Sequence, residues 1–265
     1  MSERVVMGSA SSMQRYSSIA LRWRGTYEIA LVAMACITYL VLCAMAPVRP
    51  ALAKANGWAI YHLQRAYGWT YEIDLNRWLM RQSEMLADIV TLFYTISFFV
   101  GTVAALVVLW HRNANHYALS RNALFVMTGG AAITYWAFPV APPRLLDGSP
   151  FVDTVAHANS GGTVYASFMS DFANAYGAMP SMHTGWSLWV ALSLGAFVYR
   201  RWWQRIILSL YPIFTVLAIM ATANHYILDA IFGALYCLIG FGVAILIARY
   251  VRPLPRRRSL RQTSH

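Results

Sequence analysis

Charged side chains are scarce in this sequence of 265 residues. Only 12% of the residues are Asp, Glu, Lys or Arg, and 58% are hydrophobic. A soluble globular domain carries about 25% charged residues, so this deficit excludes an ordinary water-soluble protein. Helices of roughly 20 apolar residues cross about 30 Å of hydrocarbon. Six stretches without a charged side chain approach that length: 29–46, 89–110, 122–143, roughly 181–199, 206–224 and 230–248.

Cysteine is also rare. The chain has three cysteines, Cys36, Cys43 and Cys237, and all of them fall inside apolar stretches. This usage excludes a disulfide framework and a thiolate metal site with short ligand spacing. We therefore interpret the cysteines as packed thiols, and we expect neither a metal centre nor a cofactor.

Acidic residues are outnumbered: 10 Asp and Glu stand against 21 Lys and Arg, which gives a net charge of +11. Such a balance can indicate nucleic-acid binding. Here, however, Arg200, Arg201, Arg205 and the run 256–258 flank apolar stretches. Arginines at these places favour anionic lipid headgroups at the cytoplasmic membrane face as partners, and we expect no nucleic acid.

The distribution of positive charge predicts how the chain crosses the membrane. The two tails and the loops at 111–121 and 199–205 carry fifteen Lys and Arg, whereas the other loops carry six. Because cytoplasmic segments retain positive charge, both termini are predicted to be cytoplasmic. The composition, with twenty arginines and one lysine, favours a location of the protein in a bacterial inner (plasma) membrane.

The predicted fold is all-α, a polytopic membrane bundle of six transmembrane helices. Between the first two spans, 51–81 mixes aromatic and basic residues and is predicted to form short interfacial helices. The predicted organisation is a cytoplasmic tail at 1–25, one membrane domain at 26–251 and a basic cytoplasmic tail at 252–265.

Three polar clusters stand at ends of predicted spans, and the predicted orientation places all of them on the outer side. Proline accompanies two of them, as it does at the ends and starts of helices. The clusters are Pro142, Pro143 and Arg144; Pro180, Ser181, Met182 and His183; and Asn224, His225, Tyr226 and Asp229.

His225 and Asp229 are four residues apart, a spacing that places both side chains on one face of a helix. If the carboxylate accepts the Nδ1 proton, the imidazole presents the Nε2 lone pair, as a nucleophilic histidine must. Ionisable groups at membrane depth are costly, which favours a functional role for them.

A helix N-terminus attracts phosphate through its unpaired amides and its dipole. We predict one such start at Ser181 and His183 and another at His225, with Arg144 as a forked donor to the same anion. Each residue alone has a structural interpretation, since Ser181 suits a helix cap and Arg144 can snorkel. Together they predict a phosphoryl-transfer site.

These residues resemble the type 2 phosphatidic acid phosphatase superfamily of integral membrane enzymes, over about 71–248. Pro180-Ser181-Met182-His183 is similar to its central P-S-x-H motif, and His225-x-x-x-Asp229 to the end of its last motif. The likeness is strongest to the branch of the inositol phosphorylceramide synthases, in which a His-Tyr pair is followed by Asp and Gly, here Asp229 and Gly233.

The sequence departs from the phosphatase pattern at the phosphate-binding residues. Ala218 and Ile219 stand where a Ser-Arg pair would precede the histidine, and the Lys and Arg-Pro of the first motif are not evident. We assign phosphate binding to Arg144 by its position, with Ser181. Arg77 and Arg81 are reserve candidates.

The resemblance implies that His225 attacks a lipid-linked phosphorus to form a phosphohistidine, that Asp229 supports its imidazole and that His183 protonates the leaving oxygen. Hydrolysis and headgroup transfer, including transfer of inositol phosphate, are both open. Two functions from other classes also remain open, a transporter built on six helices and a scaffold without chemistry. The lipid, the acceptor and the oligomeric state do not follow from the sequence.

Overall fold

The computed structural model describes residues 25–154 and 175–250. Within these ranges the chain is helical, and one isolated β-bridge joins Val140 and Gly177. The predicted all-α fold is confirmed for the described part of the chain. The tails predicted at 1–25 and 252–265 lie, except for Gly25, outside the described residues.

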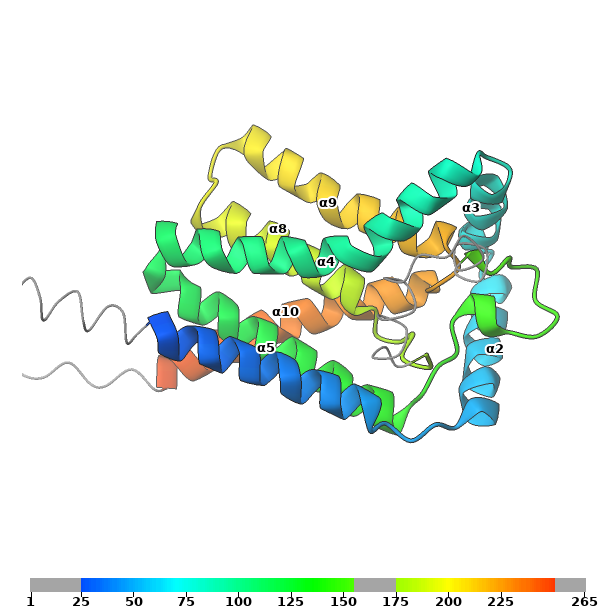
Figure 1. Ribbon diagram of the computed structural model, residues 1–265, viewed down its shortest axis with the longest axis horizontal. Helices are drawn as coiled ribbons and strands as arrows, with labels where there is room; N and C mark the ends of the chain where they lie inside the picture. Colours follow the sequence, from blue (N-terminus) through cyan, green and yellow to red (C-terminus); the bar gives the residue numbers. More distant parts are fainter. Residues whose placement is uncertain (1–24, 155–174, 251–265) are drawn as a thin grey trace, which may run out of the picture. The chain divides into compact units, whose positions relative to one another are not determined.

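The chain divides into two compact units, residues 1–45 and 46–265. The first contains the helix Gly25–Ala44. The second contains α2 (Pro50–Ala66), α3 (Tyr71–Met80), α4 (Glu84–Arg112), α5 (Ala114–Ala137), the 3-10 turn η1 (Pro143–Leu145), α8 (Met182–Phe197), α9 (Trp202–Ala221) and α10 (Ile227–Tyr250) (Figure 1).

Helices form at all six charge-free stretches, but the number of spans differs from the prediction. Among the described residues, four helices are long and apolar enough to cross a membrane: Gly25–Ala44, α4, α9 and α10. At 16 residues, α8 extends roughly 24 Å, less than the hydrocarbon thickness. The first turns of α5 carry polar side chains such as His116 and Arg121. Six spans are therefore not confirmed.

The boundaries of α5 correct one sequence prediction. The charge-free stretch 122–143 predicted a span, whereas the helix begins at Ala114 and ends at Ala137. It ends there because Pro139 disfavours the helical conformation at the preceding residue, Phe138. The segment that follows is extended and leads to Arg144 in η1.

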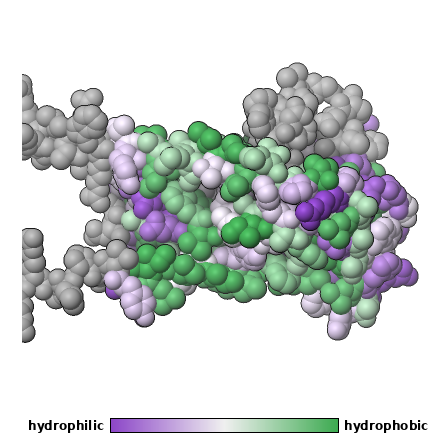
Figure 2. All heavy atoms as spheres, turned by 90° about the horizontal axis from the view of Figure 1, so that it is seen from below, coloured by the Kyte–Doolittle hydropathy of each residue, from purple (hydrophilic) through white to green (hydrophobic). Residues whose placement is uncertain are grey.

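The helix α8 lies at the centre of the second unit and packs against α4, α5, α9 and α10. Its sequence has no Asp, Glu, Lys or Arg, and eleven of its 16 residues are buried on several faces. A helix that is apolar all round is buried all round. Much of the surface drawn in Figure 2 is hydrophobic, and strongly hydrophilic residues form smaller patches on it.

Glycine lets α10 approach the start of α8. A Cβ atom added at Gly233 would lie 2.2 Å from the carbonyl oxygen of Ser181, and one at Gly240 would lie 2.6 Å from that of Ala123 on α5. At the first contact, the amide of Ser181 donates to the carbonyl of Asp229 over 2.9 Å. Small residues thus bring the backbones of neighbouring helices into direct contact, as is common in membrane proteins.

The short helices α2 and α3 lie across the end of the second unit at which α9 ends and α10 begins (Figure 1). The buried sides of these helices carry polar residues. Gln64, Glu72 and Asn76 are each no more than 1% exposed. The packing of α3 against α9 places these side chains beside the turn that carries His225.

We predict that Gly233→Ala destabilises the protein, because the methyl group would overlap the backbone at Ser181. Overpacking of this kind costs about 1–3 kcal/mol. Gly242→Ala on the same helix is the control, since nothing lies within 4 Å of its added Cβ. Thermal unfolding of the purified proteins in detergent measures the difference, and equal midpoints for the two variants would contradict the proposed contact.

Candidate active site

His225 lies in the short turn 222–226 that joins α9 to α10. Ala223 in this turn has a φ of 51°, in the left-handed region that is costly for residues other than glycine. It is fully buried, and its carbonyl accepts the amide of Arg144 over 3.0 Å. The turn is thus held in a strained conformation just before His225, as is common at functional sites.

The hydrogen bonds of His225 define its tautomer. Its Nδ1 atom lies 2.8 Å from the carbonyl oxygen of Ala178. A carbonyl oxygen only accepts hydrogen bonds, so Nδ1 carries the proton of the neutral ring. The Nε2 atom then has the free lone pair, which is the arrangement required of a nucleophile.

The contacts of Asp229 differ from those predicted from the sequence. Its Oδ2 atom is 3.4 Å from Nδ1 of His225 and accepts the amide of Tyr226 over 2.9 Å. The carbonyl of Ala178, and not this carboxylate, makes the shorter contact with Nδ1. The i,i+4 argument also assumed a helix at both residues, whereas α10 begins at Ile227. Asp229 is fully buried, so its carboxylate lies where a positive charge on the imidazole would be most strongly stabilised.

His183 faces the lone pair of His225. Its Nδ1 atom lies 3.3 Å from Nε2 of His225, and the two rings meet edge to face. Because Nε2 has no proton in this tautomer, Nδ1 of His183 donates the hydrogen bond. The two predicted catalytic histidines therefore come together, 42 residues apart in the sequence.

Two aromatic rings of α4 hold His183 in place. Tyr94 stacks on its imidazole with ring centroids 4.3 Å apart, and Phe98 packs edge to face at 4.4 Å. This aromatic pair could not be predicted from the sequence, because aromatic residues inside an apolar span carry no signal that separates them from ordinary core residues.

The two helix starts differ in the amides that they leave free. At α10 the amide of Leu228 donates to Gln64 Oε1 over 2.9 Å, and that of Tyr226 donates to Asp229. The prediction of phosphate-binding amides beside His225 is therefore wrong for these two groups. At α8, within the described part of the chain, the amides of Met182 and His183 have no hydrogen-bond partner.

Ser181 is the N-cap of α8, in agreement with the structural interpretation of this residue. Its Oγ accepts a long hydrogen bond of 3.4 Å from the amide of Thr184, and the residue is fully buried. A hydroxyl that already caps the helix is less suited to bind phosphate. The free amides of Met182 and His183 are the stronger anion donors at this start.

Arg144 lies beside the 222–226 turn. Its Nε atom donates to Asn224 Oδ1 over 2.8 Å, and one terminal nitrogen lies 3.3 Å from Asp153 Oδ2. Its side chain is 18% exposed. The structure therefore brings Arg144 to the residue next to His225, with its guanidinium oriented by an amide and a carboxylate.

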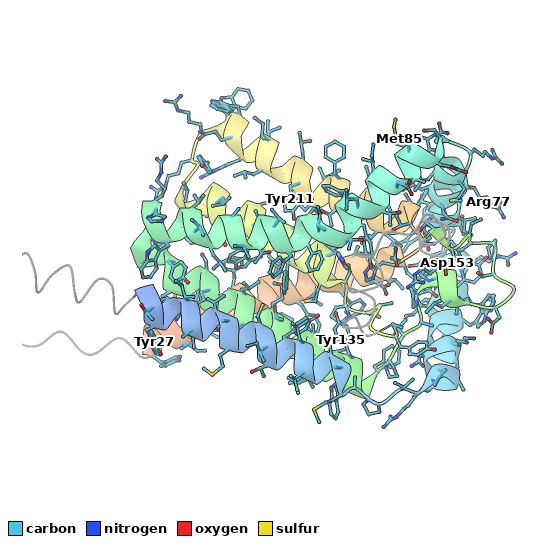
Figure 3. The ribbon with its side chains drawn as sticks, in the orientation of Figure 1. Tyr27, Arg77, Met85, Tyr135, Asp153 and Tyr211 are labelled. Atoms are coloured by element: carbon cyan, nitrogen blue, oxygen red, sulfur yellow. The ribbon has the colours of Figure 1, made fainter. Side chains whose placement is uncertain are left out.

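The reserve candidates Arg77 and Arg81 lie elsewhere. Both are exposed on or just after α3, and Figure 3 shows Arg77 on the outer side of this helix. In the described ranges, no hydrogen bond or ion pair joins either arginine to His183 or His225. They do not extend the cluster of Arg144, His183, His225 and Asp229.

Polar side chains of α2 and α3 support the turn. Gln64 bonds to the start of α10 through Oε1 and to Glu72 through Nε2, and burial raises the pKa of Glu72. Asn76 Nδ2 donates to the carbonyl of Ala221 over 2.9 Å, and its Oδ1 accepts the amide of Val152. The sequence analysis assigned this segment to the membrane surface and missed its polar contacts.

We predict that Asn76→Leu lowers stability and activity together. It leaves the buried carbonyl of Ala221 and the amide of Val152 without their partner, at about 1–3 kcal/mol for each unsatisfied group. The control is Gln82→Leu, because Gln82 is exposed and its side-chain amide donates to the carbonyl of Trp78 in the preceding helix. Thermal unfolding and turnover by the purified variants measure the effect. An Asn76→Leu protein as stable as the control would exclude this supporting role.

In the described residues, no group of three or more His, Cys, Asp or Glu side chains is arranged to hold a metal ion. The cluster instead offers an unprotonated imidazole nitrogen, a second imidazole 3.3 Å away, a buried carboxylate, a guanidinium and two free amides. Groups of these kinds can serve as a nucleophile, a proton donor and anion-binding groups in phosphoryl transfer.

Comparisons with known proteins agree with this chemistry. No curated protein and no solved structure gives a significant match. A family model, the PAP2 superfamily, matches residues 58–243, which include α3 to α9 and all four residues of the cluster. This match covers well over half of the chain. The protein therefore belongs to the PAP2 superfamily, a family of phosphatases and phosphotransferases.

Proposed function

We propose that this protein is an integral membrane lipid phosphatase or phosphotransferase, with His225 as the nucleophile. The observation that carries the proposal is the hydrogen bond from Nδ1 of His225 to the carbonyl of Ala178. It leaves the Nε2 lone pair available and directs it toward His183. A lipid-linked phosphate is the substrate class that fits a site at the end of a bundle of apolar helices.

In the first half-reaction, the Nε2 lone pair of His225 forms a bond to phosphorus. The bond from phosphorus to the leaving oxygen breaks, and that oxygen keeps the electron pair. It takes a proton from His183, which enters the step protonated on both ring nitrogens and leaves it as a neutral imidazole. The phosphorylated imidazole keeps its Nδ1 proton and is cationic, so the carboxylate of Asp229, 3.4 Å away, balances its charge. Before this step the hydrogen bond between the two histidines opens and admits the phosphate.

In the second half-reaction, His183 removes the proton of water or an acceptor alcohol, since the same group alternates between acid and base. The activated oxygen attacks phosphorus, and the electron pair of the N–P bond returns to His225. Arg144 and the amides of Met182 and His183 hold the nonbridging oxygens. Each well-placed donor of this kind contributes roughly 3–4 kcal/mol to the transition state. The scheme needs no metal ion.

The proposal includes the arrangement in the membrane. We infer that α5 and α8 cross the bilayer together with the four apolar helices, because α5 packs along α10 and α8 lies inside the bundle. Arg112, Arg200 and Arg249 then lie at one membrane face, and the histidines lie at the other. The excess of positive charge makes the first face cytoplasmic, so the site opens outward.

We predict that His225→Ala reduces phosphate release from phosphatidic acid to the background rate. His183→Ala is expected to lower the rate by about 10²–10⁴-fold, the usual contribution of an acid–base group. The control is His62→Ala, because His62 is exposed on α2 and stacks on Trp58. The assay uses purified protein in mixed micelles. In a separate trapping experiment, labelled phosphate bound to His225 is expected to be acid-labile.

A His225→Ala protein that folds normally and retains the parental rate would refute this mechanism. Loss of turnover at normal abundance would argue against the two other classes of function, the transporter and the scaffold. Asp229→Asn separates them further, since a scaffold without chemistry tolerates this change.

Headgroup transfer is the second candidate, favoured by the pattern His225, Tyr226, Asp229 and Gly233 that resembles the inositol phosphorylceramide synthases. We predict that a donor lipid with a labelled headgroup yields a new labelled lipid when an acceptor lipid alcohol, such as ceramide, is present. A hydrolase yields only water-soluble label under the same conditions. Thin-layer chromatography of the lipid and aqueous phases distinguishes the two reactions.

A further inference from the structure

An open groove of about 780 Å³ lies between α8 and α9, and its lining includes neither His183 nor His225. Its lining is aliphatic, with residues such as Leu188, Leu192 and Ile213, except for Thr184, Arg205 and Ser209. A volume of several hundred Å³ with an apolar lining and few polar groups is typical of a ligand site.

The groove runs along the helices. Its residues on α8 extend from Thr184, next to His183, to Ala196 near the loop that joins α8 to α9. These twelve helical steps correspond to about 18 Å. One leaflet contributes about 15 Å of hydrocarbon, which is half of the bilayer core. The groove thus has the length of one acyl chain.

Positive charge gathers at the loop end of the groove. Arg205 lines it, and Arg200 and Arg201 stand in the adjoining loop, all three exposed. The Nε atom of Arg205 donates to the carbonyl of Gly195 over 3.0 Å, which holds the guanidinium against the α8 side of the groove. Within the described ranges, no carboxylate forms an ion pair with these three arginines.

We propose that this groove binds an anionic phospholipid of the leaflet that faces the α8–α9 loop. One acyl chain occupies the apolar groove, and the phosphate of the headgroup contacts Arg205, Arg200 and Arg201. Basic pockets between membrane helices bind anionic headgroups in this way. The headgroup lies at the end of α8 opposite His183, so this lipid is distinct from the substrate, whose phosphate must reach His225.

The experiment uses the full-length protein, purified in detergent and titrated with phosphatidylglycerol or with phosphatidylcholine of the same acyl chains. Native mass spectrometry measures the bound lipid. We expect phosphatidylglycerol to bind about tenfold or more tightly than phosphatidylcholine, and its binding to weaken as salt is raised.

Two variants test the two halves of the site. R200Q/R201Q/R205Q removes the headgroup contacts, and Ala196→Phe fills the groove from an exposed position on α8. Both are expected to lower phosphatidylglycerol binding by about tenfold or more. The matched control is Arg249→Gln, an exposed arginine in the last turn of α10, outside the groove. Thermal unfolding verifies that each variant is folded.

Equal binding of the two phospholipids would overturn the proposal, and so would phosphatidylglycerol binding that survives either variant. A loss in Ala196→Phe without a loss in the arginine variant would show that the groove holds a chain without selecting its headgroup, which also contradicts the proposal. Turnover is not the readout, so these outcomes are independent of the catalytic role of His225.

Discussion

The direct backbone contact between α8 and α10 is the constraint on which the rest of the site depends. The amide of Ser181 reaches the carbonyl of Asp229 only because Gly233 leaves room for the carbonyl of Ser181. This contact sets the start of α8 beside the start of α10. His183 and His225 then meet although they belong to segments that are far apart in the sequence. The chemistry of the site is therefore a consequence of how closely two backbones pack.

Much of this arrangement could be predicted from the sequence. A helix forms at each of the six stretches without charge, which were chosen because a charged side chain inside hydrocarbon is costly. The polar residues at the helix ends indicated Arg144, His183, His225 and Asp229, which the structure brings together at one end of the second unit. The predicted start of the third stretch was wrong, because α5 tolerates a charged residue: Arg121 lies within this helix and not in the loop expected before it.

Other contacts carry no sequence signal. The partner of His225 Nδ1 is the backbone carbonyl of Ala178, which any residue at that position would supply. The bonds from Asn76 to Ala221 and from Gln64 to Leu228 span 145 and 164 residues. Hydrophobic periodicity and short residue spacings describe local structure, so they do not predict contacts between residues that are far apart in the sequence.

The segment between the helix Gly25–Ala44 and α4 has two faces with different surroundings. Trp69, Tyr71 and Trp78 are exposed, as expected for residues at a membrane surface, whereas Gln64 and Asn76 are buried against the α9–α10 turn. The same short helices therefore meet the requirements of an interface on one side and of a polar core on the other. The position of the turn is coupled through them to the exposed aromatic side chains on the outer side of α2 and α3.

The hydrogen bond between the two imidazoles has a consequence for the proposed mechanism. While His183 donates to Nε2 of His225, the Nε2 lone pair is shielded. An electrophile or a small solute that enters the site then meets no exposed nucleophile. Exposure of this lone pair requires displacement of the His183 ring, which packs against both Tyr94 and Phe98. In the proposed mechanism, only a substrate that gains enough binding energy from the surrounding cationic and amide groups offsets this cost, so the site selects against weakly bound compounds.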